Sequence, residues 1–280
     1  MMPPEITPMI SPIVSSTGSA TYTTSRICTG GSPRTRVDAD PALWRGPQRQ
    51  GGTRANRKEV VRVSFYFLDH HPGRGVDSHR TELLKEEPVR RGEGAFCEAC
   101  HKPVGPLPWL PPYRAEIHLS GREFGDIAFG AGYSVLVSDR FREAYEGAGL
   151  TGLDQFCCVE VVRISGRRRS GKEPPVYYKT DVRRGRAYVD DELSGIARER
   201  PLSCLACRRE PLYRVERVVI AEGSWGGEDI FVARGIPGRY IVSERFKSVA
   251  EANELRNVVL IPAEQYHYAE LPPKADQEHP

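Results

Sequence analysis

The chain has 280 residues, of which 39% are hydrophobic and 28% are charged, a composition typical of a globular protein with its own core. No stretch reaches the roughly 18 apolar residues that a membrane-spanning helix needs, which argues against an integral membrane protein. Residues 1–58 hold eight basic and three acidic residues, and the remainder holds 32 basic and 34 acidic residues. This near-neutral body argues against nucleic acid as a partner.

The N-terminal 58 residues differ in composition from the rest. They are rich in Pro, Ser, Thr, Gly and Arg without an apolar period, which predicts a disordered N-terminal arm. A second interpretation is that the start is assigned too far upstream. Because the last methionine is Met9, a downstream start would need a non-AUG codon, at Val60 or Val63. Met1–Glu5 lacks the basic n-region of a secretory signal, so we expect a cytoplasmic protein.

The body is predicted to divide into 59–200, an N-terminal half, and 201–272, a C-terminal half, with a tail at 273–280. Val60–Leu68 alternates and is rich in β-branched residues, which predicts a strand. A short helical piece is expected near Glu82–Glu87.

A proline-rich stretch follows in the N-terminal half. Pro103–Pro112 contains too many prolines for a regular helix, which predicts an ordered arm laid over a surface. Tyr113–Leu119 is then expected to be a strand.

The clearest predicted unit is a strand, a helix and a second strand. Val135–Val137 is extended, Ser138 can cap the helix that follows, and Phe156–Ile164 forms the closing strand. One buried helical face is indicated by apolar residues at i, i+3, i+4 and i+7, namely Phe141, Ala144, Tyr145 and Ala148.

The C-terminal half repeats this unit. Tyr240–Val242 is extended, Ser243 caps, and Val258–Ile261 closes; the helix face is Phe246, Val249 and Ala250. Asp126-Ile127 and Asp229-Ile230 precede the two units in the same order. We therefore predict an α+β fold of two related strand–helix–strand halves. Val159–Ile164 and Pro175–Thr180 flank a basic turn and predict a hairpin.

Four of the seven cysteines form two C-x-x-C pairs, namely Cys97, Cys100, Cys204 and Cys207. Two such pairs can complete a tetrahedral Zn²⁺ site, and in a chain without a secretory signal this spacing indicates metal first. The 103 residues between Cys100 and Cys204 far exceed the spacing of a compact zinc finger. We predict a structural, zinc-ribbon-like Cys₄ clasp that joins the two halves.

Other interpretations of the cysteines stay open. The pairs could be redox-active, disulfide-forming or free of metal. Cys97–His101 also matches the C-x-x-C-H haem pattern, although Arg208 breaks it in the second pair and haem attachment normally implies export. Cys157 and Cys158 are adjacent, and Cys28 stands alone.

The remaining motifs do not indicate catalysis. Asp139-Arg140 and Glu244-Arg245 resemble acid–base pairs, but an acidic residue in a first helical turn is expected from the helix dipole alone. The basic turn Arg167–Arg169 could contact phosphates, and Trp225 could lie at an interface or in the core. With no nucleophile elbow, phosphate loop or zinc-protease helix present, we predict a protein that is not an enzyme.

These residues together resemble the myxobacterial double-CXXCG motif family, which is grouped with immunity-type proteins. The resemblance covers roughly Phe96 to Tyr266 and rests on the two C-x-x-C pairs, Gly149–Leu153, Pro174-Pro175, Asp229–Phe231 and Val242–Phe246. The family has glycine after each pair, whereas this chain has His101 and Arg208. The resemblance implies a non-enzymatic cytoplasmic antidote that binds and blocks a cognate toxin. The alternative is a zinc-ribbon module that binds nucleic acid or regulates.

Overall fold

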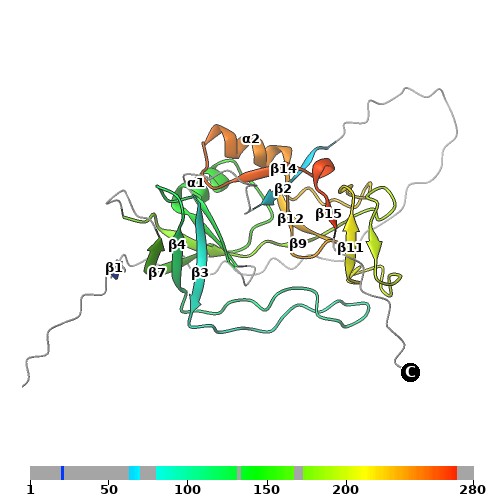
Figure 1. Cartoon of the computed structure of the whole chain (residues 1–280), viewed down its shortest axis with the longest axis horizontal. Helices are drawn as coiled ribbons and strands as arrows, with labels where there is room; N and C mark the ends of the chain where they lie inside the picture. Colours follow the sequence, from blue (N-terminus) through cyan, green and yellow to red (C-terminus); the bar gives the residue numbers. More distant parts are fainter. Residues whose placement is uncertain (1–19, 22–62, 70–79, 131–133, 167–172, 270–280) are drawn as a thin grey trace, which may run out of the picture.

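The computed structural model describes residues 20–21, 63–69, 80–130, 134–166 and 173–269. Three predicted segments lie outside these ranges: the tip of the basic turn, the C-terminal tail, and the N-terminal arm except residues 20–21. The structure therefore does not test the predicted disorder of the arm or the interpretation of a start assigned too far upstream. Within them the protein is built from three sheets and two short helices (Figure 1).

The largest sheet closes into a six-stranded barrel. Its strands follow the order β7-β4-β3-β5-β6-β8, and β8 pairs back with β7. The strands are β3 (Thr81–Glu87), β4 (Arg114–Leu119), β5 (Ile127–Gly130), β6 (Val135–Ser138), β7 (Cys157–Gly166) and β8 (Tyr177–Thr180), with β1 (Ala20–Thr21) on the outer edge of β7. Alternate residues of β4, such as Ile117 and Leu119, are fully buried inside, which is the period-2 pattern of a strand with one face in the core.

A five-stranded sheet is the second large unit of the fold. Its order is β14-β2-β13-β12-β9, from β2 (Phe65–Asp69), β9 (Arg184–Tyr188), β12 (Ile230–Arg234), β13 (Tyr240–Ser243) and β14 (Val259–Pro262). A small sheet of β10 (Ala197–Arg198), β11 (Leu212–Val215) and β15 (Tyr268–Ala269) lies next to it, and a 3₁₀ turn, η1 (Ala263–Gln265), follows β14. These elements share an apolar core that includes Phe67, Phe231 and Ile241.

The two helices lie side by side and join the barrel to the five-stranded sheet (Figure 1). They are α1 (Asp139–Gly147) and α2 (Glu244–Ala252). Ser138 and Ser243 are the N-caps, and each hydroxyl accepts the backbone N–H three residues on at 3.1 Å, as predicted. Phe141 and Phe246 hold equivalent positions in the two helices, and their rings meet with centroids 6.1 Å apart.

The predicted α+β class is wrong, because the protein is mainly β and its largest unit is a closed barrel. The repeat is real only as a hairpin followed by a helix, β5-β6-α1 and β12-β13-α2. The strand after α1, β7, closes the barrel, whereas the strand after α2, β14, pairs with β2 in the other sheet. Two similar local sequences therefore enter different sheets, so the halves are not related strand–helix–strand units.

The helix expected near Glu82–Glu87 is also wrong, because the segment is strand β3. Its composition favours a helix, but β3 pairs with β4 on one side and β5 on the other, and Leu83 is buried. The strands predicted at Tyr113–Leu119 and Phe156–Ile164 appear as β4 and β7. Of the strand predicted at Val60–Leu68, residues 60–62 lie outside the described ranges, and β2 begins at Phe65.

The hairpin predicted around the basic turn has its two strands in place. β7 and β8 pair antiparallel, with Cys157 opposite Lys179 and Val159 opposite Tyr177.

Two buried aspartates lock the repeated units onto each other. Asp126 accepts hydrogen bonds from the Ser138 hydroxyl at 2.6 Å and from Arg140 at 2.7 Å. It also accepts the backbone N–H of Arg256, in the loop after α2, at 2.7 Å. A carboxylate immediately before the first strand of one repeat thus holds the loop that leaves the helix of the other repeat.

Asp229 makes the reciprocal set of bonds. It accepts from the Ser243 hydroxyl at 2.8 Å, from Arg245 at 3.1 Å and from the backbone N–H of Thr151, in the loop after α1, at 2.9 Å. The repeated landmarks therefore form two reciprocal structural locks. Arg140 and Arg245, which belong to the two candidate acid–base pairs of the sequence, form ion pairs with these aspartates.

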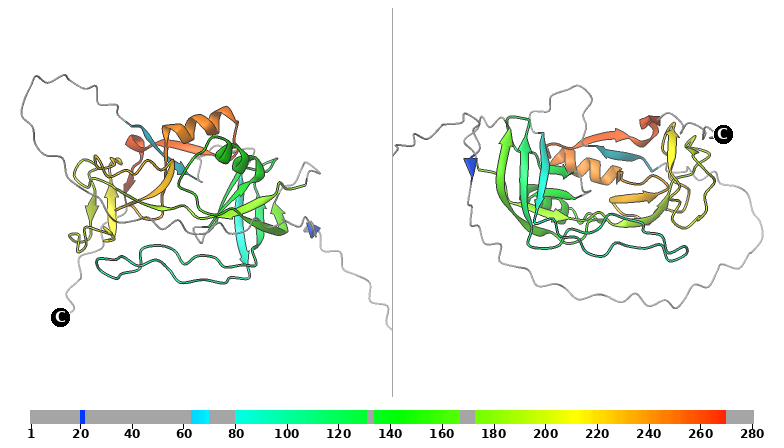
Figure 2. Two further views of the ribbon diagram at one scale, coloured as in Figure 1. Left: turned by 180° about the vertical axis from the view of Figure 1, so that it is seen from behind. Right: turned by 60° about the horizontal axis from the view of Figure 1, so that its bottom comes forward.

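A long two-stranded loop, the proline-rich ribbon (residues 88–112), runs from the end of β3 beneath the molecule (Figure 2). Its two sides are joined by backbone hydrogen bonds from Gly92 to Pro108 at 2.9 Å and from Val104 to Ala95 at 2.8 Å. At its base the indole of Trp109 is fully buried and donates to the carbonyl of Pro88. This is the ordered arm that the prolines predicted, and it carries the first cysteine pair at its tip.

Candidate metal centre

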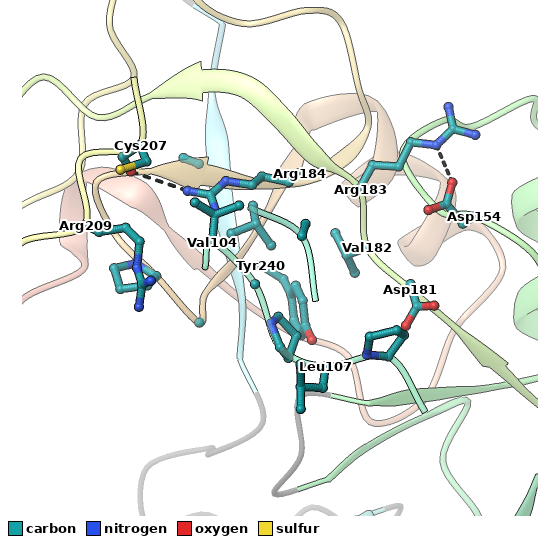
Figure 3. A pocket seen from close by; sticks show the side chains of 18 of the residues that line it. Val104, Leu107, Asp154, Asp181, Val182, Arg183, Arg184, Cys207, Arg209 and Tyr240 are labelled. Carbon is teal, nitrogen blue, oxygen red and sulfur yellow. Dashed lines mark hydrogen bonds and ion pairs between the residues drawn. The ribbon is translucent and has the colours of Figure 1, made fainter. Parts of the chain in front are cut away.

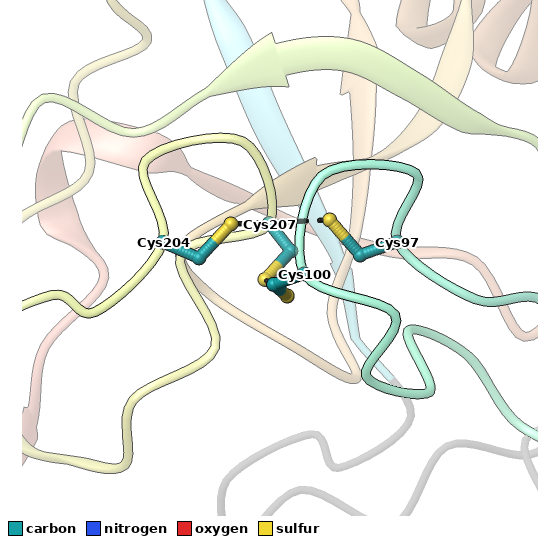
Figure 4. Close-up of side chains that lie close together, drawn as sticks. All are labelled: Cys97, Cys100, Cys204 and Cys207. Atoms are coloured by element: carbon teal, nitrogen blue, oxygen red, sulfur yellow. Dashed lines mark hydrogen bonds between the residues drawn. The ribbon is translucent and has the colours of Figure 1, made fainter.

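The structure brings together all four cysteines of the predicted clasp (Figure 4). The tip of the proline-rich ribbon supplies Cys97 and Cys100, and the loop between β10 and β11 supplies Cys204 and Cys207. The Sγ atoms of Cys97 and Cys204 are 3.9 Å apart, and those of Cys100 and Cys207 are 3.6 Å apart. All four sulfurs lie within 4.8 Å of one another.

These spacings fit one tetrahedral ion. With a Zn–S bond of about 2.3 Å, tetrahedral geometry places neighbouring sulfurs about 3.8 Å apart. Cys97, Cys204 and Cys207 are buried and Cys100 is half-buried, as in a closed structural site. All four residues are free thiols, so the disulfide interpretation of the pairs does not describe this arrangement.

Each cysteine pair lies on a tight turn that ends at His101 or Arg208, where the family that the sequence resembles has glycine. His101 has φ 56° and Arg208 has φ 52°, both in the left-handed region. Their backbone N–H groups donate to the carbonyls of Cys97 at 2.8 Å and Cys204 at 2.9 Å. Both turns therefore place a side chain in a backbone conformation that favours glycine.

Backbone N–H groups favour the thiolate at the first cysteine of each turn. Those of Cys100 and Ala99 lower the pKa of the Cys97 thiol to about 7. The N–H of Cys207 lowers the pKa of Cys204, whereas burial raises the pKa of Cys207 to about 12. One thiol on each turn is thus prepared for the deprotonation that metal binding requires.

The sequence matches a known protein family. A model of the Immunity protein family (Imm11) matches residues 118–265, more than half of the chain. The protein belongs to the Immunity protein family (Imm11). No match was found among curated proteins.

The Imm11 match covers both reciprocal locks and the second cysteine pair, and it begins after the first pair. It supports the immunity-type character that the sequence resemblance implied, and it does not bear on the double-CXXCG pattern. In this Imm11 protein the four clustered cysteines therefore come from the matched region and from the proline-rich ribbon, which precedes it.

A cavity of about 700 Å³ lies between the proline-rich ribbon and the body of the Imm11 protein (Figure 3). Val104 and Leu107 line it from the ribbon, and Val182, Arg184 and Tyr240 line it from the body. Cys207 is part of its wall, so the cavity and the clasp share a border. Nothing in the sequence pattern indicated this cavity, because its two walls lie far apart along the chain.

The other candidate residues have structural surroundings. Trp225 is half-buried, packs edge-on against Phe65 with centroids 5.2 Å apart and donates to the carbonyl of Glu228, which favours the core interpretation. His101 is exposed and is not among the four clustered residues. In the parts of the chain that the structure describes, no helix has the length and apolar character needed to cross a membrane.

Replacing His101 with glycine tests the turn geometry. We expect His101→Gly to raise the stability of the metal-loaded protein by up to about 1 kcal/mol, because a left-handed φ strains a residue with a Cβ. Thermal unfolding of the zinc-loaded protein measures this. Arg208→Gly is a poor substitute because it also removes an ion pair with Asp191. A clear loss of stability in His101→Gly would contradict the assignment of strain.

Proposed function

We propose that this protein is an immunity protein that binds and neutralises a cognate bacterial toxin in the cytoplasm. The match of residues 118–265 to the Immunity protein family (Imm11) carries this proposal. Binding is proposed to be sufficient for neutralisation. A metal ion held by the four sulfurs would have no open position for a substrate or water, so the ion itself would not be catalytic.

We also propose that Cys97, Cys100, Cys204 and Cys207 hold a structural Zn²⁺. Sulfur spacings of 3.6 and 3.9 Å, burial and an all-thiol ligand set support zinc in preference to harder cations such as Mg²⁺. The ion would fix the tip of the proline-rich ribbon to the loop between β10 and β11. It would thereby hold the wall of the cavity in place.

Growth rescue tests the function. The cognate toxin is sought as the product of a neighbouring gene and expressed from an inducible promoter, with and without this chain. We expect growth to be restored by the full chain and the two proteins to copurify. If every candidate toxin from a neighbouring gene stays lethal while this chain is expressed in soluble form, the immunity function is contradicted.

A further inference from the structure

Several arginines lie around the second cysteine turn, Cys204–Cys207. Arg198 and Arg208 share a single carboxylate, that of Asp191, at 2.8 and 2.9 Å. Glu210 accepts from the backbone N–H of Ser203 just before Cys204. Arg184, Arg209 and Arg234 form no ion pair with any described residue. These three arginines therefore bring positive charge that no ion pair with a described residue balances.

Two of these arginines reach the clasp directly. Arg184 on β9 donates to the carbonyl of Cys207 at 3.4 Å (Figure 3), and Arg234 on β12 donates to that of Ala206 at 3.0 Å. Because β9 and β12 are neighbours in the sheet, with Val232 opposite Arg184, the two guanidinium groups come from adjacent strands. Arg234 also donates to the Gly185 carbonyl at 3.4 Å. Both side chains are half-buried.

Two like charges in a half-buried place are unfavourable unless an anion lies near them. Neutral thiols or a pair of disulfides at the clasp would supply none. Four thiolates around a divalent ion carry a net charge of −2, which is the charge that Arg184 and Arg234 together balance. The charges of the body therefore match a metal-loaded clasp.

We propose that Arg184 and Arg234 are positioning residues of the metal centre: they balance the charge of the tetrathiolate and fix the second cysteine turn. This inference rests on the proposed structural zinc and goes beyond it. The two arginines lie on β9 and β12 of the five-stranded sheet. They would therefore hold the metal centre against this sheet by charge attraction.

Metal affinity of the full chain tests the inference. The double variant R184M/R234M keeps the aliphatic stems and removes both charges, whereas R184K/R234K keeps the charges. Arg186→Met is the matched control, since Arg186 lies on the same strand β9 and is exposed. Zn²⁺ affinity is measured by competition with a chromophoric chelator, and the Co²⁺–thiolate absorption band reports on the ligand set.

We expect R184M/R234M to bind Zn²⁺ about 10- to 100-fold more weakly than the wild type, as is usual when partners of metal ligands are lost. R184K/R234K should keep most of the affinity and Arg186→Met all of it. Equal affinity of R184M/R234M and wild type would overturn the inference while leaving the zinc site intact. A wild type without zinc affinity would remove the metal centre and this inference together, but not toxin binding.

Should the double variant fold poorly, the single variant Arg184→Met decides. It leaves the hydrogen bonds of Arg234 to Ala206 and Gly185 in place, so a several-fold loss of Zn²⁺ affinity with unchanged circular dichroism is expected. An unchanged affinity in this folded variant would count against the inference.

Discussion

Replacing Cys204 with serine is expected to release the metal and lower the melting temperature by about 10 °C. A ligand present at 1,000 times its Kd stabilises the folded state by about 4 kcal/mol. Each kcal/mol corresponds to about 2–4 °C in a protein of this size. Metal analysis of purified protein should give one zinc per wild-type chain and none for Cys204→Ser. Differential scanning calorimetry measures the melting temperature.

Cys157→Ser is the control for this experiment. Cys157 is a free cysteine on β7, in the barrel and outside the four-sulfur cluster, so this variant should keep both zinc and stability. A chelator should then lower the melting temperature of the wild type and of Cys157→Ser, and leave that of Cys204→Ser unchanged. A wild type that contains no zinc and does not respond to the chelator would refute the metal centre.

The clasp could be predicted from the sequence because its chemistry is local. Two cysteines separated by two residues determine the ligand type, and the long interval between Cys100 and Cys204 indicates a link between distant segments. The arginines around the four cysteines could not be predicted from the sequence. Arg184 and Arg234 reach Cys207 and Ala206 only because β9 and β12 become neighbours in the sheet.

The fold was predicted less well than the site, and the reason is strand pairing. The caps Ser138 and Ser243 and the helices that follow them are determined by nearby residues. Whether a strand joins one sheet or another depends on partners far along the chain, as β7 and β14 show. The residues of β3 favour a helix when considered alone. The segment is a strand because it pairs with β4 on one side and β5 on the other.

The reciprocal aspartates show how a repeat can be recognised correctly and still be misinterpreted. Asp126 and Asp229 appear in the sequence as landmarks without a stated role. In the structure each collects hydrogen bonds from its own cap serine, its own first-turn arginine and the backbone beyond the other helix. The repeated residues therefore hold the two hairpin–helix units together. This structural role accounts for them without a catalytic pair.

Removing one of these carboxylates should destabilise the whole protein. We expect Asp229→Ala to lower the free energy of unfolding by about 2–5 kcal/mol, because two hydrogen-bond donors lose their charged acceptor. Asp229 is 3% exposed, and its loss leaves the Thr151 N–H and the Ser243 hydroxyl without their acceptor. Urea unfolding at constant zinc measures the change, and Asp126→Ala should behave alike because its bonds are equivalent.

Asp154→Asn provides the matched control, because it removes an aspartate whose ion pair with Arg183 is exposed on both sides. Exposed ion pairs contribute about 0–1 kcal/mol, so this variant should unfold close to the wild type. Zinc content should be normal in all three variants, since the aspartates do not contact the clasp cysteines. If Asp229→Ala were as stable as Asp154→Asn, the interlock would be an ordinary surface contact, and packing of Phe141 against Phe246 would have to hold the two units together.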